Sequence, residues 1–134
     1  MKIKIVALIS ALIITTPLSA HEIIKGPNGG RLVKGEGYNV ELVINDVIAT
    51  VYVSDLKSRP IPTKGVQAHV TLTVDDQEQR IVLEAQQNDR LSGKSSVRLP
   101  TNGRGVVHLT MWNGKTLEVR FHASREFDHQ PQRK

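Results

Sequence analysis

Hydrophobic and polar residues alternate along several stretches of the chain, and the first of these stretches spans residues 38–44. A period of two residues is typical of a β-strand with one buried face. The alternation resumes at residues 47–53, so the pattern predicts a hairpin whose two-residue turn is Asn45-Asp46. On the apolar face this register opposes Ile44 and Val47, Leu42 and Ala49, Val40 and Val51, and Tyr38 and Val53.

A second hairpin is predicted from the alternation in residues 66–74 and a turn at Asp76-Gln77. Its apolar face opposes Leu72 and Ile81, and Val70 and Leu83. On the polar face the same register places His69 opposite Glu84.

The third hairpin contains Asn113-Gly114. A two-residue turn there would oppose Leu109 and Glu118, which breaks the apolar face. A three-residue loop, with Gly114 in the left-handed conformation of a bulge, opposes Leu109 and Leu117 instead. The loop is Trp112-Asn113-Gly114, and the same register opposes Met111 and Lys115, Val107 and Val119, and His108 and Glu118.

Shorter strands are expected near residues 31–34, 90–92 and 96–99, and no helical periodicity follows the first 20 residues. About seven short strands in roughly 95 residues are typical of an all-β, immunoglobulin-like β-sandwich. The predicted organisation is a signal peptide at residues 1–20, a lead-in at 21–30, the β-sandwich domain at 31–122 and a flexible tail at 123–134.

The first 20 residues have the pattern of a cleaved secretory signal peptide. Lys2 and Lys4 form a basic start, residues 5–14 form an apolar run, and Ala20 is a small residue at the predicted cleavage site. An uncleaved anchor is the alternative, although the apolar run is shorter than the roughly 20 residues that span a bilayer. Cleavage predicts a periplasmic protein with no membrane insertion.

Composition narrows the possible chemistry. Without the predicted signal peptide the chain has 16 Lys and Arg against 13 Asp and Glu, a net charge of +3, and no basic block, so nucleic-acid binding is not expected. The absence of cysteine excludes disulfides, Cys-ligated zinc or iron–sulfur sites and a cysteine nucleophile. No serine lies in a nucleophile elbow and no glycine-rich loop precedes a helix, so we do not predict an enzyme.

Any metal would therefore be bound by histidine, carboxylate or a free amino terminus. If the predicted cleavage occurs, His21 becomes the first residue, and its α-amine and imidazole can chelate one ion. Nitrogen ligands of this kind favour Cu(II), although another divalent metal is an alternative. Glu22, or a carboxylate such as Glu36, could add an oxygen, and His69 and His108 are further candidate ligands. The competing interpretation is a polar chain start and two solvent-facing His–Glu pairs.

A mature chain that begins with histidine resembles periplasmic copper-resistance β-sandwiches of the CopC type, in which a distant histidine completes the copper site. Residues 21–122 also resemble small periplasmic domains found alone, beside heavy-metal efflux systems of the RND type, or fused to their membrane-fusion adaptors. The segments that carry this second resemblance are GPNGGR at 26–31, GYNVELV at 37–43 and VYVSDLKSRPIP at 51–62. Relatives of this kind carry histidine where this chain has Asn28 and Asn39.

The resemblance implies a periplasmic accessory role in metal handling. We therefore predict a non-enzymatic binding or accessory protein of heavy-metal homeostasis or efflux, with copper as the expected metal and an efflux adaptor as the expected partner. The alternative is a metal-independent interaction module that docks an exposed strand edge, or its Pro60–Pro62 loop, on an efflux adaptor or another envelope partner.

Overall fold

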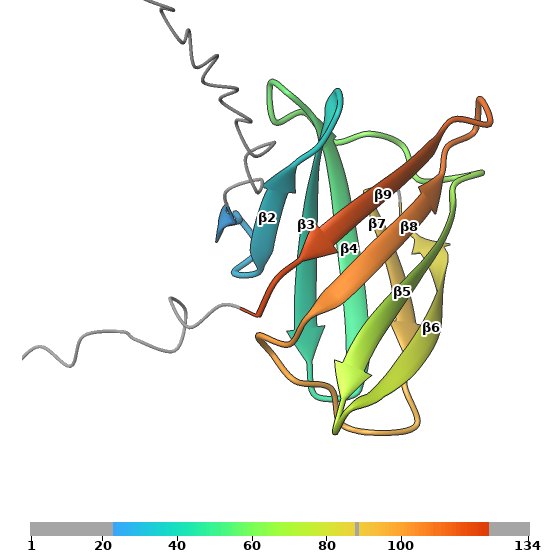
Figure 1. Ribbon diagram of the computed structural model, residues 1–134. Coiled ribbons are helices and arrows are strands. Elements are labelled where there is room, and N and C mark those ends of the chain that lie inside the picture. Colours follow the sequence, from blue (N-terminus) through green and yellow to red (C-terminus); the bar gives the residue numbers. More distant parts are fainter. Residues whose placement is uncertain (1–22, 88, 124–134) are drawn as a thin grey trace, which may run out of the picture.

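The computed structural model describes residues 23–87 and 89–123, and none of these residues lies in an α-helix (Figure 1). Nothing in this part of the chain has the length and apolar character of a bilayer-spanning helix. The predicted signal peptide, the candidate ligands His21 and Glu22, and residues 124–134 of the predicted tail lie outside the described residues. The strands are β1 (Ile24–Lys25), β2 (Arg31–Lys34), β3 (Tyr38–Asn45), β4 (Ile48–Asp55), β5 (Gln67–Val74), β6 (Gln77–Gln86), β7 (Arg90–Lys94), β8 (Gly105–Thr110) and β9 (Thr116–Phe121).

All nine strands belong to one antiparallel sheet, in the order β1-β2-β3-β4-β7-β6-β5-β8-β9. The sheet curls so that β2 and β9, from its two ends, approach each other (Figure 1). This confirms the all-β prediction. The two-sheet, immunoglobulin-like arrangement is not confirmed, because β6 joins the two halves of the sheet by hydrogen bonds.

The long strand β6 makes this junction by changing partner along its length. Residues 77–83 pair with β5, and residues 84–86 pair with β7. A Cβ atom at Gly93 of β7 would collide with the backbone carbonyl oxygen of Val82. Because glycine has no Cβ atom, the backbones of β6 and β7 can approach closely at the point where the sheet changes direction.

The hydrophobic core lies inside the curl, where alternate residues of the strands meet, and Val66, Leu99 and Met111 join it from the connecting segments. These side chains are Val33, Val40, Leu42, Ala49, Val51, Val53, Val66, Ala68, Val70, Leu72, Ile81, Leu83, Leu91, Leu99, Val107, Leu109, Met111, Val119 and Phe121. The strands face inward with the sets of residues that the period of two predicts.

The β3–β4 hairpin has a different register from the predicted one. Its turn is formed one residue later, with Asp46 in the left-handed region at a φ of 58°, so Leu42 pairs with Val51 and not with Ala49. The segment predicted as a strand at residues 96–99 is not a strand, and it holds this turn: the Leu99 amide donates to the Asp46 carbonyl at 2.8 Å.

The β5–β6 hairpin also differs from the predicted register, here because its turn is formed one residue earlier than predicted. Its turn is Asp75-Asp76, with φ of 49° and 62°, and two left-handed residues are what a tight hairpin turn of this type requires. The register moves by two residues, so His69 lies opposite Val82 and not opposite Glu84. A shift of two keeps every side chain on its predicted face while changing every partner.

The β8–β9 hairpin confirms the predicted register. His108 pairs with Glu118 and Leu109 with Leu117, and Gly114 has a φ of 85°. The Met111 amide donates to the Lys115 carbonyl at 2.8 Å, which closes the three-residue loop.

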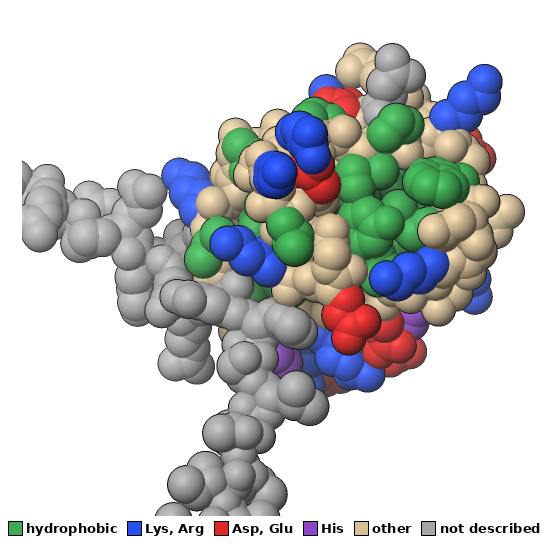
Figure 2. Space-filling model, turned by 90° about the horizontal axis from the view of Figure 1, so that it is seen from above, with side chains coloured by type: hydrophobic (Ala, Val, Ile, Leu, Met, Phe, Trp, Pro, Cys, Tyr) green, Lys and Arg blue, Asp and Glu red, His purple; other side chains and the backbone are tan. Residues whose placement is uncertain are grey.

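The loop between β4 and β5 and the β8–β9 hairpin lie at one end of the curled sheet. Figure 2 looks onto this end and shows hydrophobic side chains gathered there, with Lys and Arg side chains around them. Trp112 is 61% exposed and Leu56 is 60% exposed. Large apolar side chains therefore project from the loops at this end of the sheet.

Candidate functional site

Four outward-facing residues form a row across strands β6, β5, β8 and β9. His69 of β5 pairs with Val82 of β6 on one side and with His108 of β8 on the other. His108 in turn pairs with Glu118 of β9. The order of the strands therefore brings together two histidines that lie 39 positions apart in the sequence.

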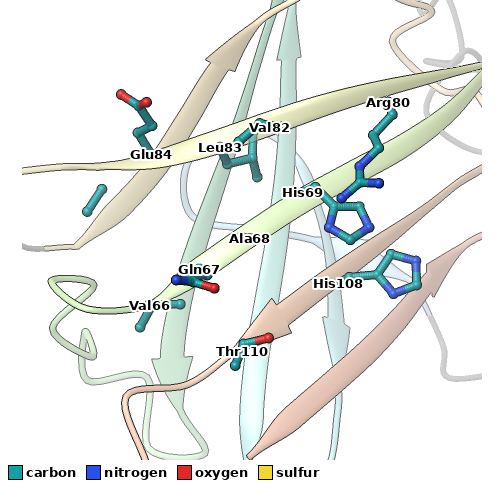
Figure 3. Close-up of a pocket in the computed structure, with 11 residues that line it drawn as sticks. Val66, Gln67, Ala68, His69, Arg80, Val82, Leu83, Glu84, His108 and Thr110 are labelled. Atoms are coloured by element: carbon teal, nitrogen blue, oxygen red, sulfur yellow. The ribbon is translucent and has the colours of Figure 1, made fainter. Parts of the chain in front are cut away.

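The two imidazole rings are stacked on each other (Figure 3), with their centroids 4.5 Å apart and their planes inclined by 20°. Both side chains are half-buried. His69 and His108 are two of the ligands proposed from the sequence, but the hairpins alone paired each of them with a glutamate. Their contact with each other comes from the β5–β8 pairing, which joins strands of different hairpins.

The pair lies in a shallow depression of about 500 Å³ on the outer face of β6, β5 and β8 (Figure 3). Polar side chains line much of it. Those that can donate or accept hydrogen bonds are Gln67, His69, Arg80, Glu84, His108 and Thr110.

The pocket favours the neutral form of His69. Partial burial lowers the pKa of His69 below its ordinary value, and the nearby charges of Arg80 and His108 lower that pKa further. Neutral imidazole has the free nitrogen lone pair that a metal ion needs.

Glu118 completes the row but is already engaged, because its Oε1 accepts a hydrogen bond from Nη2 of Arg120 at 2.7 Å. Among residues 23–87 and 89–123 no group of three histidines or carboxylates is arranged to hold a metal ion. The described site therefore offers two imidazole side chains and not a closed coordination sphere.

A second polar cluster surrounds the buried carboxylate of Glu41 on β3. The turn at residues 26–30 covers this side chain: Glu41 accepts hydrogen bonds from the Asn28 amide at 2.9 Å, from Asn28 Nδ2 at 2.8 Å and from the Gly30 amide at 2.8 Å. A Cβ atom at Gly26 would overlap the Glu41 side chain. The GPNGG segment thus has a structural role that the sequence did not reveal, although the glycines before a strand were a signal of close backbone approach.

Asn28 and Asn39, the two positions at which the resemblance implies histidine, both hydrogen-bond within the chain. Asn28 binds Glu41, and Nδ2 of the buried Asn39 donates to the Asp55 carbonyl at 3.0 Å. Oδ1 of Asn39 is buried and has no hydrogen-bond partner among the described residues.

Arg31 of β2 is a buried cation that sequence reasoning missed. Its Nη1 donates to the carbonyl oxygens of Gly103 at 2.7 Å and of His122 at 3.1 Å, and its guanidinium lies over the Phe121 ring. Burial lowers the pKa of Arg31 to about 10. Its Nε and Nη2 atoms have no hydrogen-bond partner among the described residues. The side chain ties β2 to the opposite end of the sheet.

Glu36, the alternative oxygen ligand, lies away from the histidine pair. It lines a separate groove of about 250 Å³ between β2 and β9, together with Glu118 and Val33.

Comparisons of this chain with family models, with curated proteins and with solved structures give no match.

Proposed function

We propose that this protein is a non-enzymatic, periplasmic metal-binding accessory protein of heavy-metal homeostasis or efflux, and that His69 and His108 bind the metal. The observation that carries this proposal is the contact of their two imidazoles, 4.5 Å apart in an open pocket. Copper is the expected metal, because Cu(II) binds imidazole nitrogen more strongly than the other divalent first-row ions.

The geometry supports a two-nitrogen chelate. Side chains of directly opposed residues start from Cα atoms about 4.5–5.5 Å apart, and the terminal torsion of histidine has a broad energy minimum. The proposal requires both rings to rotate out of the stack, so that one nitrogen of each turns toward a common ion. The lowered pKa of His69 supports the same role, since less proton must be displaced when the metal binds.

The predicted clamp of His21 and Glu22 is a separate part of this proposal, which depends on cleavage after Ala20. The resemblance to periplasmic domains of efflux systems supports the localisation and the partner, an efflux adaptor. The signal-peptide pattern supports secretion.

The test is a Cu(II) titration of the mature chain, monitored by calorimetry and by electron paramagnetic resonance. The same titration is done on a chain with one extra residue before His21, because this extension removes the amino-terminal chelate. In the extended chain we expect one bound Cu(II) with couplings to two nitrogens. His69→Gln and His108→Gln should each abolish these couplings, and His122→Gln, which alters an exposed histidine elsewhere, should keep them. Unchanged couplings in the first two variants would show that the pair is not the site.

The alternative function, a metal-independent interaction module, is favoured by one observation. Hydrophobic side chains gather at the end of the sheet that carries the Pro60–Pro62 loop (Figure 2). Trp112 and Leu56, in the connecting segments there, are both exposed. An efflux adaptor that docks there would copurify with the protein whether or not metal is added, and Trp112→Ser would release it. Copurification that requires copper would favour the metal-binding function instead.

A further inference from the structure

We propose that the site at His69 and His108 binds its metal as a ternary complex with a small chelating carboxylate, and that Arg80 binds the free oxygens of that carboxylate. This inference rests on the proposed metal-binding function and specifies what else the same site takes.

The number of protein ligands requires a further ligand. Cu(II) prefers four nitrogen or oxygen ligands near one plane. The pair supplies two, and the described part of the chain holds no group of three histidines or carboxylates that could hold a metal ion. Glu118, the next residue of the row, is held by Arg120. Two cis positions on the metal are therefore left for a molecule from solution, and a chelating carboxylate has the two oxygens that fill them.

Arg80 gives the pocket its preference for an anion. It lies on β6 opposite Thr71, which places it diagonally next to His69, and its guanidinium points toward the His69 ring (Figure 3). It is exposed and forms no ion pair with a carboxylate of residues 23–87 or 89–123, and Glu84 lies at the far end of the pocket. Four other arginines do pair with a nearby carboxylate: Arg59 with Asp55, Arg90 with Asp89, Arg98 with Asp46 and Arg120 with Glu118.

A guanidinium beside two metal-binding imidazoles would repel a bare dication. An anionic ligand between the metal and Arg80 reverses this effect, because it neutralises both cations. Arginine also has the planar fork of donors that matches a carboxylate. Gln67 and Thr110, which pair with each other across β5 and β8, add polar groups to the same pocket. Its volume of about 500 Å³ admits a small dicarboxylate or an amino acid.

The experiment measures the retention of radiolabelled oxalate by equilibrium dialysis. It uses the chain extended before His21, with and without one equivalent of Cu(II), and the copper content of each sample is measured in parallel. The copper-loaded protein should retain oxalate at least tenfold more tightly than the copper-free protein. Arg80→Gln should remove most of this difference, and Arg98→Gln, which alters an exposed arginine of another surface, should not.

The outcomes separate this inference from the proposed function. Copper bound through the two histidines without increased retention of oxalate would overturn the ternary complex and leave the metal site intact. Equal retention of oxalate with and without copper would show an anion site that does not depend on the metal. Equal retention of oxalate by the Arg80→Gln variant and the parent chain would show that Arg80 has no role. Either result overturns the inference. If His69→Gln and His108→Gln leave copper binding unchanged, the proposed function fails and the ternary complex fails with it.

Discussion

Glu41 and His69 both project from the outer face of the curled sheet, but their surroundings are opposite. Glu41 is 2% exposed, because the turn at residues 26–30 folds over it and donates three hydrogen bonds to its carboxylate. His69 lies in an open pocket, and its closest polar neighbours are another imidazole and a guanidinium.

The difference separates a structural group from one that is available to a ligand. The carboxylate of Glu41 is surrounded by donors of its own chain, so a metal ion would have to displace three hydrogen bonds to reach it. The histidine pair has no such covering segment in the described structure. A polar cluster on a sheet is therefore a candidate binding site only where the chain does not itself satisfy the hydrogen-bonding groups of the cluster.

The largest expected effect on stability comes from Glu41→Gln. The amide keeps one acceptor oxygen and places an NH2 group against the donors of Asn28 and Gly30, so we expect a loss of about 3 kcal/mol in the free energy of unfolding. Urea denaturation measures it. Glu84→Gln, an exposed glutamate of β6, is the control and should change the stability by less than about 0.5 kcal/mol. A loss below about 1 kcal/mol for Glu41→Gln would mean that the turn does not depend on this carboxylate.

The histidine pair should show the reverse behaviour, with a large effect on binding and almost none on folding. His69→Gln and His108→Gln should each lower the Cu(II) affinity roughly 100-fold, equivalent to about 2.7 kcal/mol. The double variant should bind more weakly than either single one, but by less than the sum of the two single losses, because the chelate contribution is already lost with the first ligand. Calorimetry checks the affinities and urea denaturation the stabilities. Additive losses in the double variant would indicate two independent sites.

The faces of the strands could be predicted from the sequence, but two of the three hairpin registers could not. Gly114 marks its turn because glycine readily takes a positive φ, and that register was correct. Asp46, Asp75 and Asp76 also adopt positive φ, and an aspartate gives a weaker signal of which residue will do so. The resulting error of one residue in the turn moves the register by two and preserves the faces.

The sequence indicated that His69 and His108 were candidate metal ligands, but it did not predict that they contact each other. Their contact depends on β5 lying beside β8, a pairing of strands from different hairpins that no local pattern specifies. Glu41 was missed for a related reason. It occupies a polar position of an alternating strand, and such a position is exposed unless a distant segment covers it.

Arg31 is an intermediate case, buried like Glu41 but only half satisfied. Arg31→Met removes two hydrogen bonds to carbonyl oxygens. It also removes a buried charge, two nitrogens of which have no partner in the described part of the chain. These effects partly cancel, so we expect a loss of about 1 kcal/mol, smaller than that of Glu41→Gln. Urea denaturation of both variants under one condition tests the order. A loss larger than that of Glu41→Gln would show that Arg31 is the stronger link between the ends of the sheet.

The smallest effect is expected at Asp55, a carboxylate that its own chain satisfies as it does Glu41, but at the surface. Asp55 accepts the backbone amide of Arg59, the Arg59 side chain at 2.7 Å and the Lys57 amide. These bonds, led by the Arg59 amide, lower the pKa of Asp55 below its ordinary value of 3.8. Above pH 3.8 the carboxylate is charged in both the folded and the unfolded chain, so its full contribution to stability is present there.

As the pH falls below 3.8, the unfolded chain takes up the proton first, and the contribution is lost as the pH passes through the lower pKa of the folded state. Asp55→Asn should therefore be slightly less stable than the parent chain at pH 7 and equal to it in strong acid. The urea midpoints of the two chains across this range measure the difference. If the difference between the two urea midpoints stays constant with pH, the charge of Asp55 adds nothing to its hydrogen bonds. Covering a carboxylate by the chain would then matter only where the cover also excludes water, as it does at Glu41.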